Sequence, residues 1–287
     1  MSQSSITCSK TNESIIINEV AMQESPHYSK PIKTALVTGA SRGIGQAVAL
    51  GLLVDGHKVV ATARSMSGMS QLKERAVKEG LSSRLLCLEM DVCDPTSIEM
   101  ACTEAEKCCG RIEILVNNAG VAESAPLHKT SDELWAHMLD VNLTGSFRVT
   151  RRLLGPMKQS DYGRVIFISS IAGLAGCLYT SAYCASKHGV IGMMRALALE
   201  VARTQITANA ICPGFVETDM AKVAIDQIQS STDRDHASAR GALESFSPQN
   251  RIFQTDEIVH SVRFLIGEGA RGVNGQAITI DGGQVMH

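Results

Sequence analysis

A tyrosine and a lysine four residues apart have the clearest chemical potential in this chain. Tyr183 and Lys187 fall near the start of residues 182–202, whose apolar spacing predicts a helix. Residues at i and i+4 share one helix face, so the hydroxyl and the ammonium can converge. A free tyrosine has a pKa of about 10, and a nearby lysine charge lowers it toward the range of acid–base chemistry. The pair indicates a proton donor, although the same spacing also arises by chance on ordinary exposed helices.

Two serines follow a predicted strand just upstream of this helix. Residues 164–169 form a short, largely apolar run, which predicts a buried strand, and Ser169 and Ser170 stand at its end. A serine hydroxyl placed there can hold a substrate carbonyl beside Tyr183. Asn142 lies in a long predicted helix that begins near Ser131.

A glycine-rich turn near the N-terminus has the spacing of a dinucleotide-binding site. The strand Thr34–Thr38 leads into Thr-Gly-Ala-Ser-Arg-Gly-Ile-Gly at 38–45, and a helix follows over 44–54. Glycines there permit the turn and let the helix N-terminus approach a pyrophosphate. Such a run is a weak signal alone, but the strand before it and the helix after it supply the required context. The predicted contacts are Gly39, Ser41, Arg42, Gly43, Ile44 and Gly45.

The second predicted strand ends where a cofactor ribose would lie. An NAD enzyme carries an acid at this place, whereas this chain has Ala63 and then Arg64. Arg64 and Arg42 can each bind a 2′-phosphate through two hydrogen bonds, which favours NADP(H) over NAD(H). The alternative is that both are solvated surface arginines.

Further candidate cofactor contacts come from the ends of later predicted strands, because ligands bind at the carboxyl ends of parallel strands. Asp91 can accept a hydrogen bond from the adenine amino group. The remaining candidates are Val92, Asn118, Ala119, Gly120, Pro213, Gly214, Val216 and Thr218, the last four lying where backbone groups can face the nicotinamide carboxamide.

Strands and helices alternate along the chain. The predicted strands are Thr34–Thr38, 58–62, 85–90, 112–116, 164–169, 207–211 and Ala277–Ile280. The predicted helices are 44–54, 69–79, Pro95–Cys109 with Asp94 as its cap, the long helix capped by Thr130 with Glu133, and 182–202. This alternation predicts an α/β fold, with one doubly wound parallel sheet of about seven strands and helices on both faces.

The sequence divides into a short extension and one domain. Residues 1–32 are polar and lack a lasting period, which predicts a flexible N-terminal extension, and residues 33–287 form the predicted catalytic domain. One long polar interruption, about 217–250, is typical of a lid or substrate loop.

Composition excludes several classes of protein. The formal net charge of −2 gives no basic field for nucleic acid or anionic membranes, and no apolar run is long enough for a signal peptide or a membrane span. The nine cysteines have no metal-ligand spacing, so we expect no metal and reduced, mostly inert thiols in a cytoplasmic protein.

Taken together, these motifs resemble the short-chain dehydrogenase/reductase family over about residues 33–287, which implies a Rossmann fold. The matching runs are TGASRGIG at 38–45, NNAG at 117–120, Asn142, Ser170, YCASK at 183–187 and PGFVETDM at 213–220. Within the family the chain is most similar to 3-oxoacyl-thioester reductases and aromatic polyketide ketoreductases. It departs from the polyketide enzymes after Gly120, where Val121-Ala122-Glu123-Ser124 replaces their Pro-Gly-Gly run.

The resemblance assigns the roles. Tyr183 exchanges the proton with the substrate, and Ser170, rather than Ser169, orients the substrate carbonyl. Lys187 holds the nicotinamide ribose and lowers the pKa of Tyr183. Asn142 fixes a water molecule beside Lys187. The resemblance implies a homotetramer that reduces a 3-oxoacyl thioester, carried on acyl carrier protein or coenzyme A, or a similar small carbonyl compound. A secondary-alcohol or hydroxysteroid-type dehydrogenase has the same mechanism. A non-catalytic NADP-sensing protein is the alternative from another class, although such a protein is expected to lack the tyrosine or the lysine.

Overall fold

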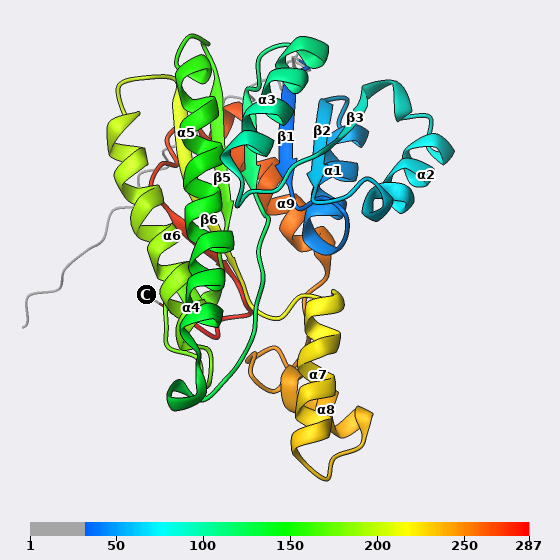
Figure 1. The fold of residues 1–287 in the computed structure, drawn as a ribbon, viewed down its shortest axis with the longest axis vertical. Coiled ribbons are helices and arrows are strands. Elements are labelled where there is room, and N and C mark those ends of the chain that lie inside the picture. Colours follow the sequence, from blue (N-terminus) through cyan, green and yellow to red (C-terminus); the bar gives the residue numbers. More distant parts are fainter. Residues whose placement is uncertain (1–31, 287) are drawn as a thin grey trace, which may run out of the picture. The chain divides into compact units, whose positions relative to one another are not determined.

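A seven-stranded parallel sheet runs through residues 32–286, which are the residues that the computed structural model describes (Figure 1). The strands are β1 (Thr34–Thr38), β2 (Lys58–Ala63), β3 (Leu85–Glu89), β4 (Ile114–Asn117), β5 (Gly163–Ile168), β6 (Ile206–Pro213) and β7 (Ala277–Ile280). They lie in the order β3-β2-β1-β4-β5-β6-β7, and every neighbouring pair is parallel. The order reverses between β1 and β4, where doubly wound sheets bind their ligands.

Helices cover both faces of this sheet. They are α1 (Gly43–Val54), α2 (Ser70–Lys78), α3 (Pro95–Cys109), α4 (Asp132–Leu139), α5 (Gly145–Met157), α6 (Ser181–Glu200), α7 (Asp219–Ser231), α8 (His236–Glu244) and α9 (Thr255–Ile266). Side chains of α1, α2 and α9 share one apolar cluster with the sheet, and those of α3, α5 and α6 share the other. The predicted fold class, a single doubly wound parallel sheet, is confirmed.

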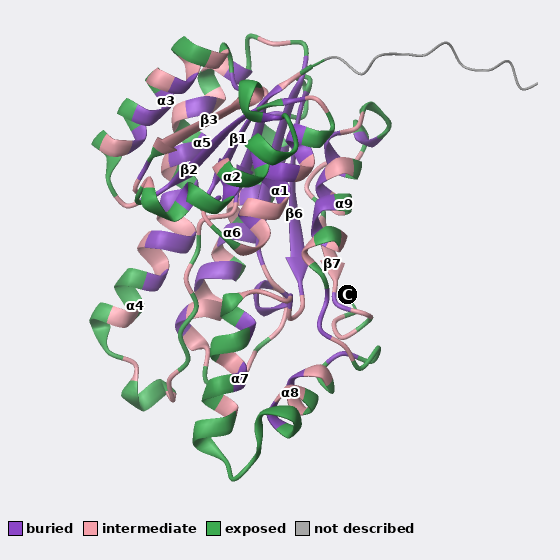
Figure 2. Cartoon of the chain, turned by 90° about the vertical axis from the view of Figure 1, so that its right-hand side faces the viewer, coloured by how far each residue is buried: buried purple, intermediate pink, exposed green. Residues whose placement is uncertain are grey.

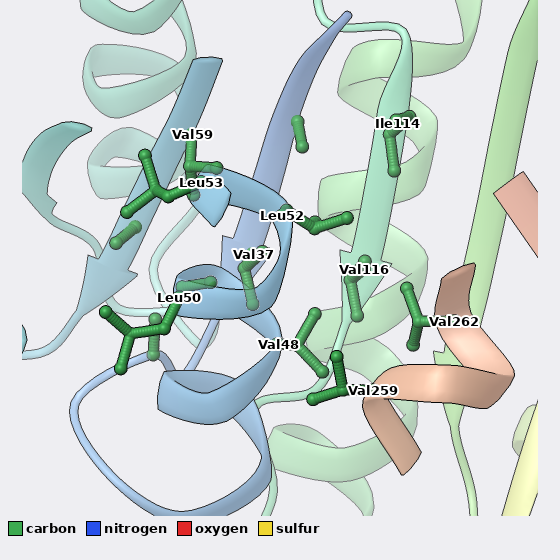
Figure 3. Packing of buried hydrophobic residues seen from close by; sticks show 14 of the residues in the cluster. Val37, Val48, Leu50, Leu52, Leu53, Val59, Ile114, Val116, Val259 and Val262 are labelled. Carbon is green, nitrogen blue, oxygen red and sulfur yellow. The ribbon is translucent and has the colours of Figure 1, made fainter. Parts of the chain in front are cut away.

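The central strands are apolar throughout because both of their faces are buried. Val37 packs in the first cluster and Leu36 in the second, and neither side chain is exposed to solvent. Figure 3 shows the first cluster, in which Val48 of α1 lies beside Val259 of α9. The sheet is therefore a rigid base for the loops at its carboxyl edge.

The long helix predicted from about Ser131 is interrupted. Five residues, Asp140–Thr144, form a π-helical turn between α4 and α5. The capping prediction at Thr130 was wrong, because Ser131 is the N-cap and its hydroxyl accepts from the Leu134 N–H at 3.2 Å. Asp94 does cap α3, as predicted, by accepting from the Thr96 N–H at 2.8 Å.

Residues 217–250 fold into two helices, α7 and α8, rather than an irregular loop. Figure 2 shows exposed outer faces on both helices. Ala221 and Ile225 of α7 pack on Ala239 and Leu243 of α8, which gives the pair a small core of its own. The spacing of Ala221 and Ile225 was the available sequence signal, but frequent polar residues hid it.

The predicted flexible extension, residues 1–32, lies outside the described residues except for Ile32, which is exposed.

Candidate active site

Three glycines shape the turn between β1 and α1. Gly39 and Gly43 have φ angles of +64° and +55°, in the left-handed region that favours glycine. A Cβ on Gly39 would lie 2.8 Å from the Cα of Ala119, and one on Gly45 would collide with the Asn118 side chain. The backbone of this turn therefore packs directly on the loop after β4.

The first turn of α1 is open to an anion. Arg42 occupies the N-cap position in an extended conformation, and its side chain makes no capping hydrogen bond. The free N–H groups and the dipole of a helix start attract phosphate. A Cβ on Gly43 would lie 3.2 Å from Thr218, so the segment after β6 approaches the turn from the other side. The predicted pyrophosphate contacts, Ser41 and Ile44 among them, thus surround an open helix start that fits a dinucleotide.

Asn118 fastens the loop after β4 to the end of β1. Its amide nitrogen donates to the carbonyl oxygens of Thr38 at 2.9 Å and Gly39 at 3.1 Å. The N–H groups of Asn118 and Ala119 both donate to the Thr38 hydroxyl at 2.9 Å. The Asn118 side chain is therefore used within the protein, and its contact with a nucleotide remains a prediction, as do those of Ala119 and Gly120.

The two arginines predicted to meet a 2′-phosphate lie on adjoining segments. Both Arg42 and Arg64 are exposed, and neither forms a salt bridge with another residue in the described range 32–286. A Cβ on Gly68 would lie 3.3 Å from the Cβ of Ser41 and 3.6 Å from the Ser65 hydroxyl. The glycine turn, which carries Arg42, and the loop after β2, which follows Arg64, are thus brought together.

An acid overlooked in the sequence lies beneath the same loop. Glu89 ends β3 and accepts from the Met66 N–H at 2.8 Å. The strand-end rule that selected Asp91 could also have selected Glu89. Asp91 itself accepts from the Cys93 N–H at 2.9 Å through one carboxylate oxygen, and Val92 is 7% exposed; the contacts of both residues with a nucleotide remain predictions.

The segment after β6, residues 213–218, is held from two directions. The Gly214 N–H donates to the Ile280 carbonyl at 3.0 Å. Val216, 5% exposed, forms an isolated parallel bridge with Phe253. These contacts fix Pro213, Gly214, Val216 and Thr218 at the carboxyl edge of the sheet, where the sequence placed them.

Tyr183 and Lys187 stand one turn apart near the start of α6, as the spacing predicted. The Lys187 Nζ lies 5.6 Å from the centroid of the Tyr183 ring. Lys187 is 5% exposed and its Nζ donates to the Ile168 carbonyl at 2.9 Å. The lysine is therefore anchored to the end of β5 and buried behind the tyrosine.

The structure separates the two candidate serines. Ser169 is buried and donates to the Lys187 carbonyl at 3.3 Å, which occupies its hydroxyl inside the fold. Ser170 is partly exposed and accepts from the Ala172 N–H at 3.1 Å, and it lies close enough to Tyr183 for its hydroxyl to act against the burial that raises the pKa of the tyrosine. Ser170 is the serine that lies beside the tyrosine.

Asn142 occupies the centre of the π-helical turn and is 1% exposed. Its Oδ1 accepts from the Val121 N–H at 2.8 Å, and its Nδ2 donates to the Val121 carbonyl at 3.0 Å. A Cβ on Gly120 would lie 3.1 Å from Asn142 Oδ1 and 3.6 Å from Lys187 Nζ. The asparagine thus joins the loop after β4 to the neighbourhood of the lysine.

Burial controls the protonation of the pair. It raises the pKa of Tyr183 to about 12, against an opposing hydrogen bond with Ser170, and it lowers the pKa of Lys187 to about 8. The net shift of the Tyr183 pKa is therefore upward, because desolvation of the phenolate dominates. That the charge of Lys187 acts against this shift remains a prediction. The spacing of the two residues does not reveal how deeply the tertiary fold buries them.

Two cysteines near the site, Cys177 and Cys212, are not activated nucleophiles. Burial raises the pKa of Cys177 and of Cys212 to about 11, which disfavours their thiolates. All cysteines within residues 32–286 are free, as predicted, whereas Cys8 lies outside the described residues.

A cavity of about 450 Å³ lies elsewhere, between Arg251 and the C-terminal residues 281–286, and none of the predicted site residues lines it.

Comparison with known proteins identifies the family. Residues 33–229 match the short chain dehydrogenase family. The 3-oxoacyl-[acyl-carrier-protein] reductase MabA of Mycobacterium tuberculosis is 37% identical over 88% of this chain and 93% of its own length. The corresponding reductase FabG of Escherichia coli is 35% identical over 88% of this chain and 98% of its own. A solved structure of an actinorhodin polyketide ketoreductase variant with NADPH is 36% identical, covers 88% of this chain and 97% of that one, and superposes with a TM-score of 0.85.

The chain belongs to the short-chain dehydrogenase family, and it is an oxidoreductase. The resemblance found in its motifs is confirmed. Among residues 32–286, no helix is both long enough and apolar enough to cross a membrane.

Proposed function

We propose that this protein is an NADPH-dependent reductase of the ketone in a 3-oxoacyl thioester. The observation that carries the proposal is the convergence of the Tyr183 and Ser170 hydroxyls, with Lys187 buried behind them, at the end of β5. The open start of α1 at the same edge of the sheet fits a dinucleotide.

A bound reduced nicotinamide supplies the hydride that adds to the carbonyl carbon. The Ser170 hydroxyl orients the carbonyl oxygen, and Tyr183 donates its phenolic proton to that oxygen as the alcohol forms. The phenolate left on Tyr183 is stabilised by the positive charge of Lys187 and regains a proton from solvent. A tyrosine whose pKa is raised to about 12 keeps its proton at neutral pH, which is the form that can donate to a carbonyl oxygen.

The preference for NADPH rests on the residues around the loop after β2. Ala63 supplies no acid for the ribose diol, and Arg42 and Arg64 supply positive charge and paired donors. The Glu89 carboxylate opposes a 2′-phosphate, but a loop N–H already engages it. The NADPH-bound ketoreductase with the similar fold adds support.

Exposed apolar side chains flank the proposed site and favour a substrate with an apolar chain. Leu178 and Tyr179, 79% and 56% exposed, lie in the loop before α6. Met220 and Val223, 48% and 53% exposed, lie one turn apart on α7, and the same helix meets the loop after β4 where the Ser124 hydroxyl donates to Gln227 at 3.0 Å. The names of the curated relatives agree with an acyl thioester, on acyl carrier protein or coenzyme A.

The test is a steady-state assay of NADPH oxidation with acetoacetyl-coenzyme A, and with steroid ketones and simple cyclic ketones as comparison substrates. We expect the highest kcat/KM with the 3-oxoacyl thioester. A higher value with a steroid or simple ketone would instead support the secondary-alcohol or hydroxysteroid reaction class. No turnover with any ketone and either nucleotide would contradict the proposed activity.

A further inference from the structure

Ser186 lies between the two predicted catalytic residues of α6 and has no role assigned by its sequence motif. It is 0% exposed. A hydroxyl that is fully buried requires hydrogen-bond partners, and a serine supplies one donor and two acceptor positions for them. The partners that this hydroxyl selects therefore indicate what it does.

Both hydrogen bonds of Ser186 connect parts of the proposed active site. Its hydroxyl donates to the Tyr183 carbonyl oxygen at 2.8 Å. It accepts from Asn142 Nδ2 at 3.0 Å. The directions are fixed, because a carbonyl oxygen can only accept, so the single hydroxyl proton goes to Tyr183.

The orientation of the Asn142 amide is fixed as well. Its Oδ1 faces the Val121 N–H and its Nδ2 faces the Val121 carbonyl, so a flipped amide would set donor against donor. One Nδ2 proton is used by Val121, and the second goes to Ser186. The two amide protons of Asn142 thus hold the loop after β4 and helix α6 at once.

We propose that Ser186 is a positioning residue, whose hydroxyl sets α6, with Tyr183 and Lys187, at a fixed distance from the loop after β4 through Asn142. The inference rests on the proposed function. Ser186 does not act as an acid or base, because its only proton is given to a backbone carbonyl. An alanine would keep the Cβ but lose both hydrogen bonds, so the hydroxyl is the part of the residue that makes the connection.

The effect of removing the hydroxyl follows from the contacts. In Ser186→Ala, the second amide proton of Asn142 stays buried without a partner, which is unfavourable enough for the amide to shift. A displacement of about 1 Å between reacting groups can lower a rate by about 100-fold. We therefore expect kcat for ketone reduction to fall by about 10–100-fold, with NADPH affinity retained.

The experiment compares kcat, NADPH binding and the primary isotope effect with 4-deuterated NADPH in the full-length protein. If Ser186 positions the reacting groups, hydride transfer becomes slower relative to other steps and the isotope effect on kcat rises. A role in stability alone would lower the melting temperature and leave the isotope effect unchanged. The matched control is Ser261→Ala on α9, where a serine hydroxyl donates to the Glu257 carbonyl at 2.9 Å far along the chain from the site, and we expect parental kinetics.

A folded Ser186→Ala protein with parental kcat and isotope effect would overturn the inference. If that variant does not fold, Ser186→Thr and Ser186→Cys decide the matter. The threonine keeps a hydroxyl and should be the faster, because a thiol is a weak donor and acceptor; equal kinetics in the two variants overturn the proposal. The two proposals can be told apart. If the parent reduces the ketone, Tyr183→Phe does not, and Ser186→Ala is as active as the parent, then the proposed function stands and only the positioning role of Ser186 is refuted.

Discussion

Replacing Lys187 with methionine should change how the stability of the protein depends on pH. Lys187 is 5% exposed, and burial lowers its pKa from 10.5 to about 8. Between these values the unfolded chain binds more protons than the folded protein. The contribution of Lys187 to the free energy of unfolding therefore rises as the pH increases from about 8 to 10.5. Methionine is similar in length and does not titrate, so the variant lacks the rise.

The magnitude follows from the displacement of the pKa. Since each pKa unit corresponds to about 1.36 kcal/mol, the full contribution is about 3 kcal/mol, and about 2–3 kcal/mol of it falls between pH 7 and pH 10. Tyr183 and Cys212 face this site with raised pKa values and act in the opposite direction at high pH. Both residues are present in the parent and the variant, so the difference between the two proteins chiefly isolates Lys187.

The assay is urea unfolding without nucleotide, at several values from about pH 7 to about pH 10. The stability of Lys187→Met relative to the parent should decline steadily over this range. Lys222→Met is the matched control, because Lys222 is 66% exposed and pairs only with Asp219 one turn away on α7. If the difference between Lys187→Met and the parent is the same at both ends of the range, the reasoning about burial is refuted.

Two further predictions concern the nucleotide. Arg64→Asp should lower the ratio of kcat/KM for NADPH to that for NADH by about 10–100-fold, since a charge-assisted hydrogen bond contributes about 1.5–3 kcal/mol. The control Arg75→Asp, on α2, should leave the ratio unchanged. An unchanged ratio in Arg64→Asp would show that Arg64 is a surface residue without a role in nucleotide choice. Gly45→Ala should abolish NADPH binding measured by fluorescence titration, because its Cβ collides with the Asn118 side chain, whereas Gly155→Ala meets no atom within 4 Å and should bind normally. Tight NADPH binding by Gly45→Ala would contradict the close packing of the turn.

The fold could be predicted from the sequence because its signals are local. Apolar runs such as Thr34–Thr38 mark strands buried on both faces, and Asp94 before Pro95 marks a helix start. Such signals act within a few residues of chain. They suffice for the alternation of strands and helices, and hence for the doubly wound sheet.

The features that the sequence does not show are those that tertiary contacts decide. The raised pKa of Tyr183 follows from burial, which the spacing of Tyr183 and Lys187 does not show. The choice of Ser170 over Ser169 came from the family resemblance, whereas the structure gives the reason, since Ser169 is turned to the Lys187 carbonyl. Ser186 was not recognised because its partner, Asn142, is 44 residues earlier in the chain.

The central claim is that Tyr183 donates the proton during ketone reduction, and one measurement tests it most directly. Single-turnover hydride transfer from NADPH to acetoacetyl-coenzyme A is followed in the parent and in Tyr183→Phe, which keeps the ring and removes only the hydroxyl. The account predicts a rate lower by about 10²–10⁴-fold, with NADPH affinity unchanged. A near-parental rate in a folded, NADPH-binding Tyr183→Phe protein would contradict the account.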